Sequence, residues 1–312
     1  MVNLFGLVNN YSILNYTIFF FTVSLFSVNS CFTMRLFQKD WEWRPEVKKI
    51  ESFPEGDFLV WLGHSTFLIK LSGYVFYTDP VIFDKVVIIK RQIKFPVELE
   101  KLPPPHFILI SHNHYDHMDI PSLNFLSEKS KKNGINPYIF VSQNASIYLK
   151  NESYKVVELK WGDKYKIRDG FEILSVRVRH FSGRNLFDWN FSKWNGYLVV
   201  SDGVKIFFGG DTAYLKLPRF EPDIALIPIG AYLPRWFMKR NHVSPCEAVK
   251  MAYDIGAKIM IPMHYGTFKQ GLDTPEQAIY EMKECAKKFG VKTLIPSPGE
   301  IILIEDVRRM EK

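Results

Sequence analysis

The stretch FILISHNHYDH, residues 107–117, runs from an apolar, strand-like segment straight into a turn that carries three histidines and an aspartate. Alternation along an extended segment places His112 and His114 on the same side of the chain. Imidazole and carboxylate groups are ligands for zinc and similar divalent ions, so His112, His114, Asp116 and His117 are candidate ligands. One turn cannot close a site for two ions, and we expect further ligands elsewhere in the chain.

Three more candidate ligands each follow an apolar run that is typical of a strand: His180 after FEILSVRVR, Asp211 after IFFGG and His264 after IMIPM. Strand ends present side chains at one rim of a sheet, where a shared site can form. Gly209 and Gly210, directly before Asp211, would let the backbone approach a metal closely. The sequence therefore predicts a two-ion site, with one ion held by His112, His114 and His180, the other by Asp116, His117 and His264, and Asp211 and a hydroxide as bridges.

Short runs of β-branched and aromatic residues recur along the chain, mostly separated by Gly, Pro or Asn turns. Residues 244–256 have the signals of a helix, with Ser244 as N-cap and Glu247 closing a capping box, and residues 274–290 repeat this logic. Many strands with helices between them predict an α/β fold in which two mixed sheets pack face to face with helices outside. Strands are expected at residues 58–62, 66–71, 74–79, 107–111, 138–142, 171–178, 196–201, 204–211, 223–230 and 258–264.

The chain opens with a hydrophobic segment, residues 1–33, that contains no acidic or basic side chain. Within it, residues 11–28 form a mostly apolar stretch at the lower limit of membrane-spanning length. Three interpretations stay open: a membrane anchor, a degenerate signal, or an extension upstream of a start at Met34. Residues 34–312 are expected to form one domain. If the segment is an anchor, this domain would be membrane-associated on the cytoplasmic side, because positive charge follows the segment. A start at Met34 would give a soluble cytoplasmic protein.

The composition and charge of the chain narrow the class of its partners. The 312 residues are 47% hydrophobic and carry a formal net charge of +7, which favours anionic partners such as phosphate groups or a phospholipid surface. We find no basic arm of the kind a nuclease would carry, and expect no nucleic-acid partner. Cys31, Cys246 and Cys285 stand far apart, and their spacing indicates neither a disulfide framework nor a thiolate zinc site. The oligomeric state stays open, a homodimer included.

The ordered motif HxHxDH, a distant histidine, GGD and the histidine of MHYGTF resembles the signature of the metallo-β-lactamase superfamily. The resemblance covers residues 57–305 and implies a four-layer αβ/βα sandwich with two divalent ions, zinc being the expected metal. WLGHSTFLI (61–69), GGDTAY (209–214) and IPIGAYLPRWFMKRNHVSPCEAV (227–249) look like the branch that hydrolyses N-acylphosphatidylethanolamine. This likeness implies a phospholipase D-type hydrolase that cleaves a phosphodiester of such a lipid by attack of the bridging hydroxide.

The same resemblance implies roles for residues near the motifs. Tyr115 and His242 would contact the phosphodiester head group. In the expected reaction, His242 or a metal-bound water would protonate the leaving oxygen, and Asp116 would both ligate a metal and orient the nucleophile. Packing within a loop is the alternative for Tyr115, and a position just before a helix is the alternative for His242. Asp79 is expected to hydrogen-bond to a ligand or to cap the end of a strand, and His64 to be buried and structural.

The aromatic and basic run at residues 235–240 would suit an apolar chain beneath an anionic head group, or would pack with its Trp and Met inward. Residues 83–96 and 180–194 depart from the phospholipase branch, so the substrate is less determined than the metal site. A lactone hydrolase of the same superfamily, acting on a sugar-derived substrate, is the alternative enzyme. A membrane-tethered binding protein without activity would lack ligands, and a diiron oxidase would have a carboxylate in place of His114.

Overall fold

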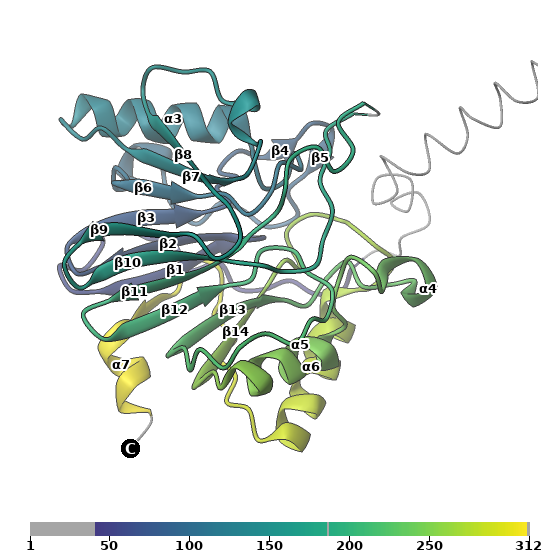
Figure 1. The fold of residues 1–312 in the computed structure, drawn as a ribbon. Helices are drawn as coiled ribbons and strands as arrows, with labels where there is room; N and C mark the ends of the chain where they lie inside the picture. Colours follow the sequence, from purple (N-terminus) through teal and green to yellow (C-terminus); the bar gives the residue numbers. More distant parts are fainter. Residues whose placement is uncertain (1–40, 186, 311–312) are drawn as a thin grey trace, which may run out of the picture.

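The computed structural model describes residues 41–185 and 187–310, so the hydrophobic segment at residues 1–33 lies outside the described range. Two β-sheets lie face to face, with helices on the outer side of each (Figure 1). This arrangement confirms the predicted α/β sandwich of four layers. Within the described residues, every helix is too short or too polar to cross a lipid bilayer.

The first sheet has seven strands in the order β15-β1-β2-β3-β6-β7-β8. Along β1, Phe58 and Val60 belong to the same hydrophobic cluster as Leu123 of helix α3 (Ile120–Lys132), whereas Leu59 and Trp61 belong to the cluster shared with the second sheet. Every residue of β1 is buried because both faces of the sheet are covered. The strands are β1 (Phe58–Gly63), β2 (Thr66–Leu71), β3 (Tyr74–Thr78), β6 (Phe107–Leu109), β7 (Tyr138–Ser142), β8 (Lys155–Leu159) and β15 (Ile301–Leu303).

The second sheet has six strands in the order β14-β13-β12-β11-β10-β9, of which β12, β13 and β14 run parallel. β13 and β14 are buried along their whole length, as expected for parallel strands covered on both faces. A separate hairpin pairs β4 (Lys85–Val86) with β5 (Ile89–Lys90). The strands of the second sheet are β9 (Lys164–Arg168), β10 (Phe171–Val176), β11 (Gly196–Ser201), β12 (Val204–Phe208), β13 (Ile224–Pro228) and β14 (Ile259–Met263).

Both helices predicted in the last third are confirmed. In α5 (Pro245–Ile255), the Ser244 side chain accepts from the backbone of Glu247, and the Glu247 side chain accepts from the backbone of Ser244. At the start of α6 (Pro275–Phe289), the Thr274 side chain accepts from the backbone of Gln277, whereas the Gln277 side chain donates to Glu281. Both helices end at a glycine in the left-handed conformation, which favours glycine over other residues. The two helices pack against each other and cover the second sheet.

Helix α3 (Ile120–Lys132) covers the first sheet and was not predicted. Its N-cap is Asp119, whose side chain accepts from the backbone of Ser122. The buried side of α3 carries Leu123 and Leu126 but also three serines, which interrupt the apolar stripe that would reveal a helix. The short helices α4 (Arg235–Met238) and α7 (Ile304–Arg309) and the 3₁₀ turns η2 (Leu99–Lys101) and η3 (Ser146–Tyr148) complete the described elements.

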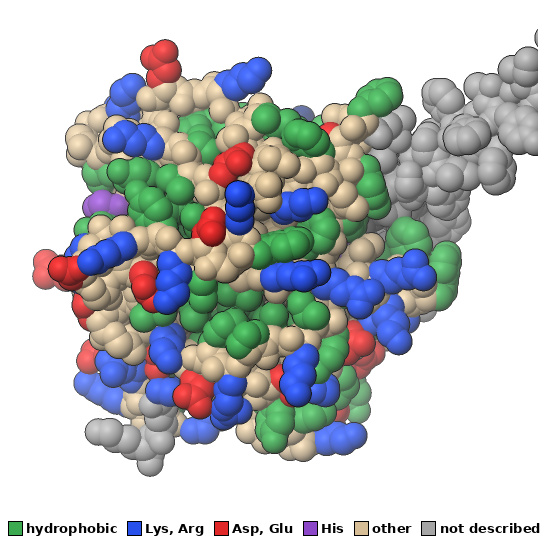
Figure 2. All heavy atoms as spheres, in the orientation of Figure 1, with side chains coloured by type: hydrophobic (Ala, Val, Ile, Leu, Met, Phe, Trp, Pro, Cys, Tyr) green, Lys and Arg blue, Asp and Glu red, His purple; other side chains and the backbone are tan. Residues whose placement is uncertain are grey.

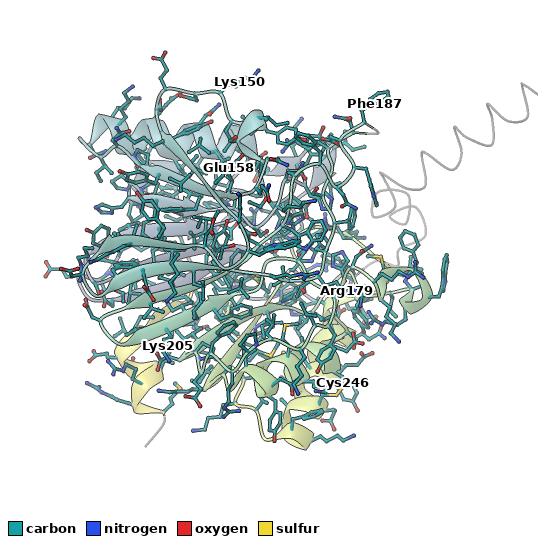
Figure 3. All side chains as sticks on the ribbon, in the orientation of Figure 1. Lys150, Glu158, Arg179, Phe187, Lys205 and Cys246 are labelled. Carbon is teal, nitrogen blue, oxygen red and sulfur yellow. A yellow bond between two sulfur atoms is a disulfide. The ribbon has the colours of Figure 1, made fainter. Side chains whose placement is uncertain are left out.

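The structure corrects the expectation for the cysteines, because Cys246 and Cys285 form a disulfide. Cys246 lies in the first turn of α5 (Figure 3), and Cys285 lies on α6. Packing of the two helices brings the Cα atoms of these residues to 5.3 Å, a normal distance for a disulfide. Sequence spacing carried no sign of this pair, since the contact is between elements 39 residues apart.

The carboxyl ends of several strands meet at one rim of the sandwich. β3 and β6 run parallel in the first sheet, as β12, β13 and β14 do in the second. The backbone N–H of His264, just after β14, donates to the backbone oxygen of His64, just after β1, at 3.0 Å. This bond joins the ends of the two sheets. All seven predicted metal ligands come from segments that follow strands at this rim.

Candidate metal centre

A group of three histidines forms one half of the site. His112 and His114 come from the turn after β6, and His180 comes from the segment after β10. His112 Nε2 lies 2.7 Å from His114 Nδ1, and the rings of His112 and His180 lie 4.6 Å apart between centroids. One nitrogen from each ring lies within 4.8 Å of the others, so a single ion could contact all three. These are the residues predicted to hold the first ion.

A second group contains the residues predicted to hold the other ion. His117 Nε2 lies 3.3 Å from Asp116 Oδ2, and His264 Nε2 lies 3.7 Å from the same oxygen. His64 joins this group, because its Nε2 lies 2.8 Å from Asp116 Oδ2. The prediction that His64 is buried is confirmed, but the side chain contacts the site and is not only part of the core.

Asp211 lies between the two groups. Its Oδ2 is 3.2 Å from His117 Nε2 and 3.1 Å from His264 Nε2 in the second group, and 3.8 Å from His180 Nε2 in the first. Gly210, just before it, has φ of +56° and lies so close to Ser111 that a Cβ there would be 2.5 Å from the serine Cβ. The glycine therefore permits a close backbone approach, here to the residue before His112. The carboxylate is thus near both groups, and its role as a bridge stays a prediction.

The outer nitrogens of three histidines are held by hydrogen bonds. His117 Nδ1 donates to Asp79 Oδ2 at 2.6 Å, His180 Nδ1 donates to the backbone oxygen of Asn241 at 2.9 Å, and His112 Nδ1 lies 2.9 Å from Ser111 Oγ. Such bonds fix the ring so that the opposite nitrogen faces inward with a free lone pair. Asp79 therefore has the hydrogen-bonding position predicted for it.

Electrostatics distinguish the three histidines of the first group from His264 of the second. Burial lowers the pKa of His114 to about 3 and that of His180 to about 4, and it holds the pKa of His112 well below its usual range. Burial also acts on His264, but the carboxylates of Asp211 and Asp116 outweigh it and raise this pKa to about 9. The carboxylates of Asp211 and Asp116 thus favour positive charge beside them, which a bound cation could also supply.

The residues of the centre fit divalent cations. Several of their polar atoms are buried without a hydrogen-bond partner, which is costly unless another group satisfies them. Imidazole nitrogen and carboxylate oxygen are also the donor set that zinc takes in catalytic sites. The unsatisfied atoms are His117 Nε2, His180 Nε2, His264 Nδ1 and Nε2, His242 Nδ1 and Asp211 Oδ1.

The two residues predicted to contact substrate lie in different surroundings. His242 is buried, its ring centroid is 5.2 Å from that of His180, and its Nδ1 is 3.9 Å from Asp211 Oδ2. Tyr115 is 44% exposed, and its hydroxyl donates to the backbone oxygen of Arg184 at 3.2 Å. The Arg184 guanidinium stacks 4.0 Å above the tyrosine ring. His242 thus faces the centre, and Tyr115 lies against the segment after His180.

Sequence patterns missed several residues around the centre. Gln270 Nε2 donates to Asp116 Oδ2 at 2.7 Å, although no motif pointed to a lone glutamine in the loop after His264. Phe181 packs beside His114, with ring centroids 4.5 Å apart, and stacks on Trp189. These two rings form an apolar wall next to the first group. The sequence feature that could have indicated this wall is the aromatic content of residues 180–194.

The run at residues 235–240 matches neither interpretation completely. Met238 is buried, as packing of a helix predicts, but Trp236 on the same helix is 83% exposed. Arg235 donates to the backbone oxygen of His242 at 2.9 Å and to Glu247 Oε2 at 2.7 Å. Figure 2 shows Lys and Arg side chains gathered beside exposed hydrophobic ones where α4 lies. The run therefore joins the His242 segment to an exposed surface.

A family model described as the beta-lactamase superfamily domain matches residues 75–265. The chain belongs to this superfamily. It is 36% identical to N-acyl-phosphatidylethanolamine-hydrolyzing phospholipase D 1 of Caenorhabditis elegans, with the match covering 69% of this chain and 65% of that protein. It is 34% identical to the mitochondrial N-acyl-phosphatidylethanolamine-hydrolyzing phospholipase D of Saccharomyces cerevisiae, covering 67% and 47%. The match thus spans about two thirds of one relative and about half of the other.

Solved structures agree with the fold. The isothiocyanate hydrolase from Delia radicum gut bacteria superposes with a TM-score of 0.62 at 20% identity, covering 78% of this chain and 98% of that one. The chain thus has the fold of this superfamily and carries two groups of candidate metal ligands. It resembles the branch that hydrolyses N-acylphosphatidylethanolamine, as the motifs indicated.

Proposed function

We propose that the chain is a zinc-dependent phosphodiesterase that cleaves an N-acylated phosphatidylethanolamine, releasing phosphatidate and an N-acylethanolamine. The observation that carries this proposal is the position of Asp211 Oδ2, within 3.2 Å of His117 and His264 and 3.8 Å from His180. A carboxylate shared between two ligand groups suits two ions side by side. The names of the relatives from C. elegans and S. cerevisiae support the lipid substrate.

The chain's own residues would hold two zinc ions in the groups already described. His112, His114 and His180 would hold one, Asp116, His117 and His264 the other, and Asp211 would bridge. When bound, two such ions supply Lewis acidity, which lowers the pKa of a shared water and stabilises charge on a phosphoryl oxygen.

Three side chains would direct the reaction at the phosphorus. Asp116, whose Oδ2 is held by protein donors, would orient the attacking water. As that water adds, the bond between phosphorus and the ethanolamine oxygen breaks, and the leaving oxygen takes a proton. His242, buried beside Asp211, would contact the phosphodiester and supply that proton, and Tyr115 at the exposed edge would contact the head group. These roles follow from position and from the resemblance.

The substrate would be drawn from a phospholipid surface, and the domain would be membrane-associated on the cytoplasmic side. Two exposed aromatic residues lie on segments that lead to the centre: Trp236 on α4 and Phe187, 96% exposed, at the outer tip of its loop (Figure 3). The exposed Lys239 and Arg240 follow Trp236 in the chain. Aromatic side chains with basic neighbours suit the interface of an anionic membrane.

The test uses the full-length chain purified in mild detergent. Its metal content is measured, and it is assayed on N-palmitoyl phosphatidylethanolamine, a sugar lactone and bis(p-nitrophenyl) phosphate. We expect about two zinc ions per chain and cleavage of the lipid, lost in Asp211→Ala and kept in the control Asp169→Ala, whose side chain is 94% exposed. Fast lactone cleavage without lipid cleavage would refute the proposed lipid substrate. An active Asp211→Ala variant would refute the proposed two-ion mechanism.

A further inference from the structure

The carboxylate of Asp116 is held by two protein donors that belong to neither group of predicted ligands. His64 Nε2 lies 2.8 Å from Asp116 Oδ2, and Gln270 Nε2 donates to the same oxygen at 2.7 Å. His64 follows β1 in the first sheet, and Gln270 lies in the loop after His264 in the second. The same oxygen also faces His117 and His264.

The two donors are themselves fixed by the segment at residues 264–270. The backbone N–H of His64 donates to Thr267 Oγ1 at 2.6 Å, and the ring of Phe268 meets the His64 ring edge to face at 5.2 Å. The backbone oxygen of Thr267 accepts from the backbone N–H of Gln92 at 2.8 Å, which anchors the segment to the loop after the β4–β5 hairpin. His64 also has φ of +54°, a conformation that a histidine keeps only where its surroundings hold it.

We infer that His64 and Gln270 are positioning residues that together fix the orientation of the Asp116 carboxylate. A carboxylate on one rotatable bond could turn away from His117 and His264, but two donors on Oδ2 from opposite sheets leave it one orientation. Both bonds end on the same oxygen, so the direction of the carboxylate is set before a cation or water arrives. This inference rests on the proposed metal site, and it assigns roles that the motifs did not.

A positioning role for His64 predicts different effects for two substitutions of this residue. In His64→Gln the side-chain Nε2 can reach Asp116 as the imidazole Nε2 does. In His64→Asn the amide is too short, although asparagine tolerates positive φ better than most residues. A role in hydrogen bonding predicts that glutamine restores function and asparagine does not. A role only in the backbone turn predicts the reverse.

The experiment titrates zinc into full-length variants against a chromophoric chelator and also measures kcat and KM. We expect Gln270→Ala and His64→Asn to weaken one of two zinc equivalents by about 10-fold to 100-fold, the range for groups that orient ligands. We expect kcat to fall with KM within twofold, because the substrate is not touched. His64→Gln should bind zinc within threefold of the unsubstituted chain. Gln277→Ala, at an exposed glutamine on α6, is the matched control.

The zinc titration tests the roles of His64 and Gln270 without any substrate. It therefore distinguishes a wrong inference about these two residues from a wrong assignment of the lipid substrate. Wild-type zinc affinity in both Gln270→Ala and His64→Asn would overturn the inference. Equal zinc affinity in His64→Asn and His64→Gln would overturn it for His64. Equal loss at both zinc equivalents would also contradict it, since the contacts lie at Asp116 alone.

Discussion

Replacement of Asp79 by asparagine should weaken zinc binding at one ion and leave the fold intact. Asp79 is fully buried and accepts from the backbone N–H of Ser111 at 2.7 Å, from Ser111 Oγ at 2.5 Å and from His117 Nδ1 at 2.6 Å. Asparagine can keep the bond to the Ser111 backbone through its oxygen. Its NH₂ group then faces the other two donors, of which the serine hydroxyl can rotate but the imidazole N–H cannot.

His117 in this variant must move its proton to Nε2 to accept from the new amide. That places the proton on the nitrogen facing Asp211 and the second ion. The lost charge-assisted hydrogen bond is worth about 1.5–3 kcal/mol, which corresponds to about 10-fold to 100-fold in affinity. Asp211, the proposed bridge, stays in place, so the first proposed ion should be affected much less.

The measurement is a zinc titration of full-length Asp79→Asn against a competing chelator, with a thermal melt by circular dichroism. Asp169→Asn removes an exposed carboxylate in the turn between β9 and β10 and is the control. Two zinc equivalents of wild-type affinity in Asp79→Asn would refute the reasoning. A collapsed melt with no zinc bound would show instead that Asp79 acts mainly on folding.

Three further predictions concern backbone packing, the disulfide and protonation. Gly230→Ala would place a Cβ 2.1 Å from the backbone oxygen of His264, so we expect a loss of about 1–3 kcal/mol in unfolding free energy and weaker zinc binding. Gly56→Ala, which meets nothing within 4 Å, is the control, and unchanged zinc affinity in Gly230→Ala would contradict the geometry. Replacing Cys246 and Cys285 by serine opens a loop spanning 39 residues and should lower the unfolding free energy in urea by about 4 kcal/mol. Reductant should then destabilise only the unsubstituted chain, and equal sensitivity would argue against the disulfide. The pKa of His264, lowered by burial but raised by Asp211 and Asp116 to about 9, lies above its ordinary value of 6.5. Its proton therefore stabilises the metal-free chain fully below pH 6.5, and that stability is lost as pH rises toward 9. Urea midpoints after chelation should fall over this window, and a profile that stays flat would count against the assignment.

Much of the site could be predicted because its ligands carry a local signal. His112, His114, Asp116 and His117 are close in sequence, and a cluster of such residues is rare after a buried strand. The capped helix at α5 was equally visible, because the Ser244 capping box is a contact between near neighbours.

The features that escaped prediction depend on contacts between distant segments. Gln270 reaches Asp116 across 154 residues, and Cys246 meets Cys285 only because α5 and α6 pack together. Gln270, Cys246 and Cys285 lie in no sequence pattern that distinguishes them from ordinary loop or helix positions. Helix α3 escaped for a different reason, since serines on its buried side weaken the apolar period.

The two ligand groups are each drawn from both halves of the sandwich. The turn after β6 supplies ligands from the first sheet, and the segments after β10, β12 and β14 supply the rest from the second. Each proposed ion would thus act as a cross-link between the sheets, and neither sheet alone offers a complete coordination set. Zinc loading would therefore report that the two halves have assembled, and catalysis could begin only in a chain whose folding is finished.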